Sequence, residues 1–155
     1  MKFIPHPEDL PQEAQSIQFH FEDIIIPGFI EEAEKSWIIK CVKSEDVQHG
    51  TLQFIFCRDE YLYEMNVKYL GHHDYTDVIT FDYSANKKVI SGDIFISYER
   101  VVDNAHAMGE DVMVELRRVL IHGVLHLIGY TDQSPEDQAE MRRKENYCLS
   151  LRQQI

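Results

Sequence analysis

Hydrophobic and polar positions alternate near the start of the chain and then recur at helical spacing. Ile17, Phe19 and Phe21 alternate with polar side chains, a pattern that predicts a half-buried β-strand. From Ile30 to Cys41 the apolar residues form one stripe, mostly at intervals of three and four, which predicts an amphipathic helix. We therefore expect a strand followed by a helix in this part of the chain.

Three further segments have the composition of strands. Residues 52–57 are apolar almost without interruption, which predicts a buried strand. Residues 78–83 and 92–97 predict two more strands, and the polar residues 84–88 between them predict an exposed turn. The sheet is therefore expected to contain four strands.

Three helices are predicted between and after these strands. Residues 59–70 form one, with Asp59 at the N-cap, where a carboxylate can accept hydrogen bonds from the first turn. Residues 98–108 form the next. Residues 110–128 form a long helix whose centre is apolar almost all round, so we expect it to be buried.

A final helix is predicted to begin near Ser134. The serine caps it, Pro135 suits the first helical position, and acidic residues follow in the first turn. The full order is then strand, helix, strand, helix, strand, strand and three helices. This order predicts one α+β domain over residues 1–155, with about five helices packed on a mixed four-stranded sheet.

The long helix carries the pattern of a metal site. His122 and His126 are four residues apart, so their side chains lie on one helix face and can reach one ion. Asp132 lies too far along a continuing helix, roughly 15 Å, to share that ion. If Gly129 ends the helix, the chain can fold back and bring Asp132 to the metal. Two nitrogens, one oxygen and a free position are typical of a catalytic zinc site, although Asp132 also suits a plain turn.

The residue after the first histidine separates this site from the metalloproteases. Their zincin helix has a glutamate there, which acts as general base, whereas this chain has Gly123. The helical geometry is zincin-like, but peptide hydrolysis is disfavoured. Glycine costs the helix about 1 kcal/mol relative to alanine. Its role is either close approach of another backbone or of substrate to the metal, or tight packing of the helix on a strand.

The run from His122 to Asp132, HGVLHLIGYTD, resembles the signature H-G-x-L-H-L-x-G-Y-D-H of the bacterial rRNA maturation factors, the YbeY-type metallo-endoribonucleases. Segments 64–70, 75–81 and 92–94 resemble further motifs of that family in the same order. The chain departs from the family at two points. Asp132 stands at the position of the third metal-binding histidine, and Leu70 stands where the family has an arginine. Aspartate is an acceptable zinc ligand.

The Leu70 departure raises the question of what supplies positive charge to bind or polarise a phosphate. Arg58, Lys68, Lys87 and Arg118 are candidates by charge alone, although each is expected to be a solvated surface residue. His72 and His73 lie nearby in the motif order and are expected on a loop surface. No general acid or base is specified, so the catalytic residues are unknown at this stage.

The resemblance implies a single-strand-specific endoribonuclease that matures ribosomal RNA, at the 3′ end of the small-subunit rRNA, and takes part in ribosome quality control. It further implies one Zn²⁺ per chain, bound by His122, His126 and Asp132. Two alternatives stay open. One is a non-catalytic ribosome-assembly factor with a structural zinc, which the departures at Leu70 and Asp132 favour. The other is a divergent zinc peptidase.

The charge and the cysteine content indicate which binding partners and which cellular compartment to expect. The formal net charge of −12 argues against a broad basic face that grips nucleic acid non-specifically. An acidic surface suits docking to a ribosomal subunit or to basic ribosomal proteins, while a cleft at the metal handles single-stranded rRNA. Three widely spaced cysteines resemble buried hydrophobes and fit a reducing cytoplasm. No apolar run is long enough to cross a membrane, and no secretion signal is recognised.

Overall fold

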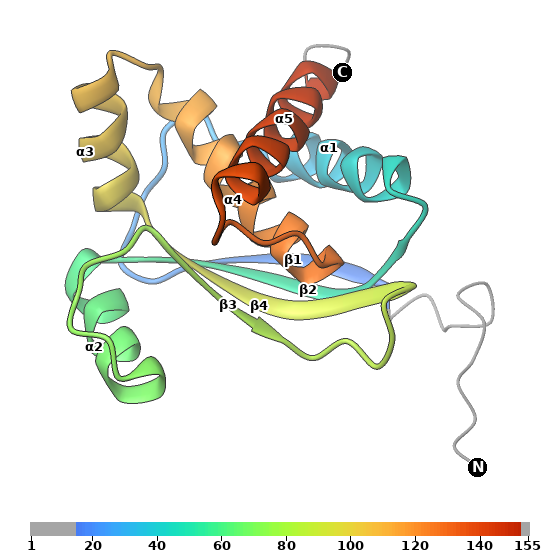
Figure 1. The fold of residues 1–155 in the computed structure, drawn as a ribbon. Coiled ribbons are helices and arrows are strands. Elements are labelled where there is room, and N and C mark those ends of the chain that lie inside the picture. Colours follow the sequence, from blue (N-terminus) through green and yellow to red (C-terminus); the bar gives the residue numbers. More distant parts are fainter. Residues whose placement is uncertain (1–14, 153–155) are drawn as a thin grey trace.

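The computed structural model describes residues 15–152, which form one α+β domain (Figure 1). Its mixed sheet has the strand order β1-β2-β4-β3. The first two pairings, β1 with β2 and β2 with β4, are parallel, whereas β3 runs antiparallel to β4 at the edge. The strands are β1 (Ser16–Phe21), β2 (Gln48–Cys57), β3 (Val78–Asp82) and β4 (Val89–Ser97).

Helices are placed unequally on the two faces of this sheet. Figure 1 shows α1, α3, α4 and α5 above one face and α2 below the other. The helix α4 packs on β3 and β4, and α5 packs on α1 and α4. The helices are α1 (Glu31–Ser44), α2 (Asp59–Leu70), α3 (Tyr98–Met108), α4 (Val112–Ile128) and α5 (Pro135–Arg152).

The core is divided accordingly. The main cluster lies between the sheet and the four helices and includes Trp37, Phe54, Ile94 and Leu120, all completely buried. A small second cluster around Leu62 attaches α2 to the opposite face. Because the helix α4 contributes to the main cluster along most of its length, it is a rigid support for side chains that project from its remaining face.

The predicted order and type of the elements are confirmed, and the differences lie at their ends. The strand β2 begins at Gln48 and β4 at Val89, earlier than predicted. Gln48 and Val89 pair through their backbones, and such pairing does not require an apolar pattern in the side chains. The strand β3 ends at Asp82. The helix α4 begins at Val112, and the Asp111 carboxylate caps it.

The predicted N-cap role of Asp59 is wrong. Asp59 is the first helical residue, and the N-cap position belongs to Arg58, whose side chain makes no capping hydrogen bond. The Asp59 carboxylate instead accepts hydrogen bonds from the Ser97 hydroxyl and from the Arg100 guanidinium, with Nη2 2.6 Å from Oδ2. The charge-assisted hydrogen bond to Arg100 on α3 is stronger than the bond that Asp59 would make as an N-cap. The predicted cap of α5 is confirmed, since Ser134 Oγ accepts the Asp137 N–H.

Within residues 15–152 we find no helix long and apolar enough to cross a membrane.

Candidate metal centre

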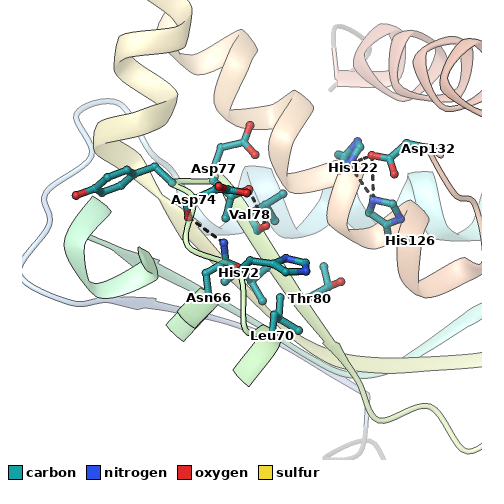
Figure 2. Close-up of a pocket in the computed structure, with 13 residues that line it drawn as sticks. Asn66, Leu70, His72, Asp74, Asp77, Val78, Thr80, His122, His126 and Asp132 are labelled. Carbon is teal, nitrogen blue, oxygen red and sulfur yellow. Dashed lines mark hydrogen bonds and ion pairs between the residues drawn. The ribbon is translucent and has the colours of Figure 1, made fainter. Parts of the chain in front are cut away.

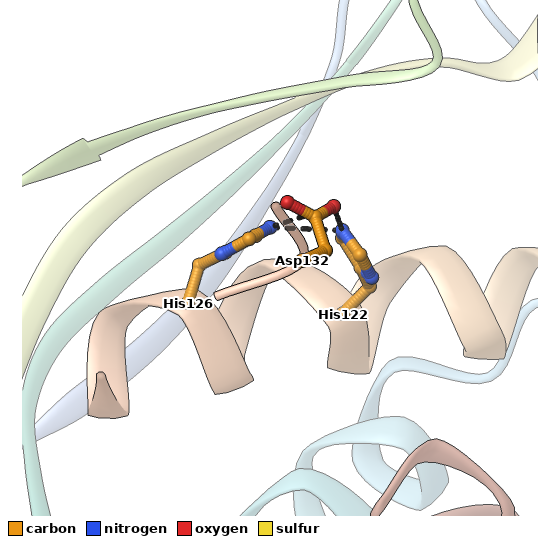
Figure 3. A group of neighbouring side chains, drawn as sticks. All are labelled: His122, His126 and Asp132. Carbon is orange, nitrogen blue, oxygen red and sulfur yellow. Dashed lines mark hydrogen bonds and ion pairs between the residues drawn. The ribbon is translucent and has the colours of Figure 1, made fainter. Parts of the chain in front are cut away.

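The three predicted ligand side chains lie together at the end of α4 (Figure 3). The two Nε2 atoms of His122 and His126 lie 2.9 Å apart. One carboxylate oxygen of Asp132 lies 3.4 Å from the His122 Nε2 and 3.7 Å from the His126 Nε2. Ligand atoms bound to a tetrahedral zinc ion lie roughly 3.3–3.6 Å apart. The three atoms therefore have about the spacing that one small cation requires.

A helix stop brings Asp132 back to the histidines. Gly129 has φ of 127°, which favours glycine, and its N–H donates to the carbonyls of Leu125 and His126 at the end of α4. The next N–H, of Tyr130, also turns back to Leu125. The chain reverses within these residues, as the glycine and the spacing of Asp132 predict.

Hydrogen bonds on the far side of each imidazole orient the pair. His126 Nδ1 lies 3.0 Å from the Tyr130 carbonyl and His122 Nδ1 lies 2.7 Å from the Glu145 carboxylate. Carbonyls and carboxylates accept, so both Nδ1 atoms carry the protons and the neutral rings direct Nε2 lone pairs at each other and toward Asp132. Three acceptor atoms that converge on one point suit a cation between them. The donor set therefore fits a metal ion, and the Nδ1 partners are those that metal-binding histidines use.

The negative charges around the centre favour a positive charge at this point. Burial alone lowers the pKa of His122, but the hydrogen bond and charge of Glu145, with Asp132 and Asp77, outweigh it and raise that pKa. Burial raises the pKa of Glu145, but hydrogen bonds from His122 and Arg118 outweigh it and lower that pKa. The same negative charges that raise the pKa of His122 would stabilise a metal ion at this point.

Glu145 is the residue that sequence reasoning missed. It projects from α5 and is buried, and it joins His122 to Arg118 and Arg142, with Arg118 Nη1 at 3.1 Å. The expectation that Arg118 is solvated is therefore wrong, because Arg118 is ion-paired beside the centre. No spacing rule links positions 122 and 145, which meet only when α5 packs on α4.

We expect Glu145→Gln to weaken zinc binding by about 10–100-fold, because the neutral amide holds the His122 imidazole less firmly and makes it less basic. Competition with a zinc chelator measures the affinity. Glu140→Gln is the matched control, since Glu140 is a partly exposed acid of the same helix that pairs with Arg143. An unchanged affinity in the Glu145 variant contradicts the orienting role.

Gly123 allows the helix to pack tightly on the sheet. A Cβ built at this position lies 2.8 Å from the Ile94 side chain and 3.3 Å from that of Thr80. Such contact leaves no room even for a methyl group without rearrangement. Of the two expected roles, tight packing of the helix on a strand is therefore confirmed, and an acidic side chain has no place here.

A cavity of about 440 Å³ opens beside the centre (Figure 2). One wall is formed by His122, His126 and Asp132, and the opposite wall comes from the end of α2, the loop that follows it and the strand β3. That opposite wall comprises Asn66, Leu70, His72, Asp74, Tyr75, Thr76, Asp77, Val78, Ile79 and Thr80. Burial raises the pKa of Asp77 in this wall.

The basic residues singled out by charge do not line this cavity. Arg58 donates to the Asp23 carbonyl, Lys68 lies over the Tyr69 ring, and Arg118 pairs with Glu145. Among the described residues, no lysine or arginine contributes to the cavity wall. His72 and His73 are both exposed, as expected for the loop, but His72 also lines the cavity.

The fold and the site define this protein as an α+β domain with a candidate metal centre. A buried helix presents two histidines, a glycine ends that helix, and the chain then returns a carboxylate to the histidines, so that the three side chains could hold a metal ion. The chain belongs to the family described as Endoribonuclease YbeY, whose model matches residues 17–152.

Individual relatives agree with this assignment. The chain is 45% identical over 121 residues to the endoribonuclease YbeY of Christiangramia forsetii, covering 78% of this chain and 84% of the relative. It is 50% identical over 117 residues to that of Amoebophilus asiaticus, covering 75% and 80%. The solution structure of TM1509 from Thermotoga maritima superimposes with a TM-score of 0.64 at 27% identity, over 88% of this chain and 89% of that one.

Proposed function

We propose that this chain is a metal-dependent endoribonuclease that cleaves single-stranded RNA during the maturation of ribosomal RNA, at the 3′ end of the small-subunit rRNA, and in ribosome quality control. The names of its relatives support ribonuclease activity. The observation that carries the proposal is the convergence of three acceptor atoms on the wall of a cavity, so that one side of the centre faces open space. A substrate phosphate can enter from that side.

The proposed cofactor is one Zn²⁺ ion held by His122 Nε2, His126 Nε2 and an Asp132 carboxylate oxygen. When bound, the ion supplies a Lewis acid for the phosphate and for water. The chain itself fixes the direction of the two imidazoles through Glu145 and the Tyr130 carbonyl. Zinc suits two imidazoles and one carboxylate in a four-coordinate site with one open position.

The substrate and the setting follow from shape and charge. Single-stranded RNA can bend its backbone into a cavity at the edge of a sheet, whereas a regular duplex holds its phosphates in a fixed helix. The charge of −12 favours docking to basic ribosomal proteins of a subunit. The three free, buried cysteines suit a reducing cytoplasm.

The two alternatives require features that are not present among residues 15–152. A structural zinc site takes a fourth protein ligand, whereas the group of donors within 4.8 Å of one another has three members. A peptidase of the zincin type needs a glutamate at position 123, where Ile94 blocks any side chain. Catalysis on RNA is therefore preferred to both.

Zinc-loaded wild-type protein is tested on a single-stranded RNA, on the same RNA annealed to its complement, and on casein. We expect cleavage of the single strand, loss of cleavage after EDTA treatment and dialysis, and recovery on adding zinc. Cleavage that survives removal of the metal overturns the proposal. Tight zinc binding without RNA cleavage supports the assembly-factor alternative, and metal-dependent digestion of casein supports the peptidase.

A further inference from the structure

We infer that His72 is a substrate-contacting residue that donates a hydrogen bond to the RNA phosphate held in the cavity. The inference rests on the proposed function and names the group that receives the anion opposite the metal centre. His72 lies on the loop between α2 and β3 and lines the cavity. Figure 2 shows its ring projecting into the cavity from the wall that faces His122 and His126.

The charges that line the cavity favour His72 as the group that meets the phosphate. The cavity wall carries three carboxyl groups, those of Asp74, Asp77 and Asp132, and no lysine or arginine of residues 15–152. A phosphodiester is an anion, so the carboxylates of Asp74 and Asp77, which do not bind the proposed zinc ion, oppose its entry. Apart from His122 and His126, whose nitrogens are already engaged, His72 is the one described lining side chain that can carry positive charge.

No other described residue engages the His72 ring. Its ring nitrogens have no hydrogen-bond or ion-pair partner in the part of the chain that the structure describes, and it is outside the group that could hold the metal. An imidazole always has at least one N–H to donate, and two when protonated. The ring is thus available to an oxygen of the substrate.

Backbone hydrogen bonds hold His72 in place. Gly71 ends α2 in the left-handed conformation, with φ of 66°, and the next N–H, of His72, donates to the Asn66 carbonyl at 3.1 Å. The side chain of Asn66, which is 4% exposed, donates to the Asp74 carbonyl at 2.9 Å. Asn66 therefore binds the loop at His72 and again at Asp74, and a substrate does not have to order the loop first.

The activity test compares His72→Ala with His73→Ala in the zinc-loaded protein. His73 is the matched control, because it is the next residue on the same exposed loop and does not line the cavity. Loss of a charge-assisted hydrogen bond predicts that kcat/KM on single-stranded RNA falls about 10–100-fold in the His72 variant. The His73 variant stays within about twofold of wild type. His72→Arg, which restores an N–H donor, recovers most of the loss.

A binding test separates this inference from the proposed function. Inorganic phosphate is titrated into the zinc-loaded protein while the imidazole resonances are followed by NMR, with His72 assigned from its absence in His72→Ala. We expect the His72 signals to shift, the His73 signals to stay, and the phosphate affinity to fall several-fold in the His72 variant. If wild-type protein cleaves no RNA, the proposed function fails and this titration alone decides the role of His72. Equal behaviour of the His72 and His73 variants in both tests overturns the inference.

Discussion

Replacing His126 by alanine is expected to abolish RNA cleavage and the binding of added Zn²⁺ while the fold persists. The imidazole provides one of three ligand atoms, and no fourth donor lies within reach among the described residues. A metal Lewis acid contributes several kcal/mol to stabilising the charge that develops in the transition state. Each 1.36 kcal/mol is a factor of ten in rate, so we expect a loss of roughly a thousandfold or more.

Metal content by elemental analysis, cleavage of single-stranded RNA and the circular dichroism spectrum measure this result. The fold should survive, because the side chain of His126 is partly exposed and alanine is a good helix former. His106→Ala is the matched control, an exposed histidine near the end of α3, and it should retain zinc and activity. A His126 variant that cleaves RNA at the wild-type rate contradicts the metallo-nuclease.

Replacing Glu34 by alanine is expected to lower the free energy of unfolding by about 3–5 kcal/mol. Glu34 is completely buried, and its carboxylate oxygen Oε1 lies 2.8 Å from Arg117 Nε and 3.1 Å from Arg152 Nε. One carboxylate on α1 thus joins α4 and α5. Its removal leaves two partly buried guanidinium groups without a counter-charge, which costs far more than an exposed ion pair.

Urea denaturation followed by circular dichroism measures the change. Glu32→Ala is the control on the same helix, because Glu32 is 89% exposed and pairs with Lys35 at 3.8 Å. This variant should differ from wild type by less than about 0.5 kcal/mol. If the free energy of unfolding of the Glu34 variant falls by less than about 1 kcal/mol, the buried ion pairs do not stabilise the fold as expected.

Local patterns in the sequence were sufficient for the fold class and for the order of elements. Alternation in β1, the apolar run in β2 and the caps of α5 are properties of neighbouring residues, so periodicity and turn chemistry detect them. The ends of β2 and β4 were not predictable in this way. Gln48 and Val89 join the sheet because they pair with each other across two strands. Pairing between residues so far apart in the sequence cannot be predicted from local composition.

The candidate site also has a part that local sequence predicts and a part that it does not. His122, His126, Gly129 and Asp132 belong to one short segment, so helix geometry and a glycine stop predict their convergence. The partners of the site come from distant segments. Glu145 arrives on α5, and the wall that faces the histidines arrives with α2 and β3, so only tertiary packing reveals them.

The position of Glu145 in the last helix makes the orientation of the site depend on the docking of that helix. His122, His126 and Asp132 belong to one short segment, whereas the Glu145 carboxylate reaches His122 Nδ1 only when α5 packs on α4. The same docking brings Arg152 to Glu34 on α1. A chain with α5 undocked would thus keep the three proposed ligands but lose the carboxylate that orients one of them.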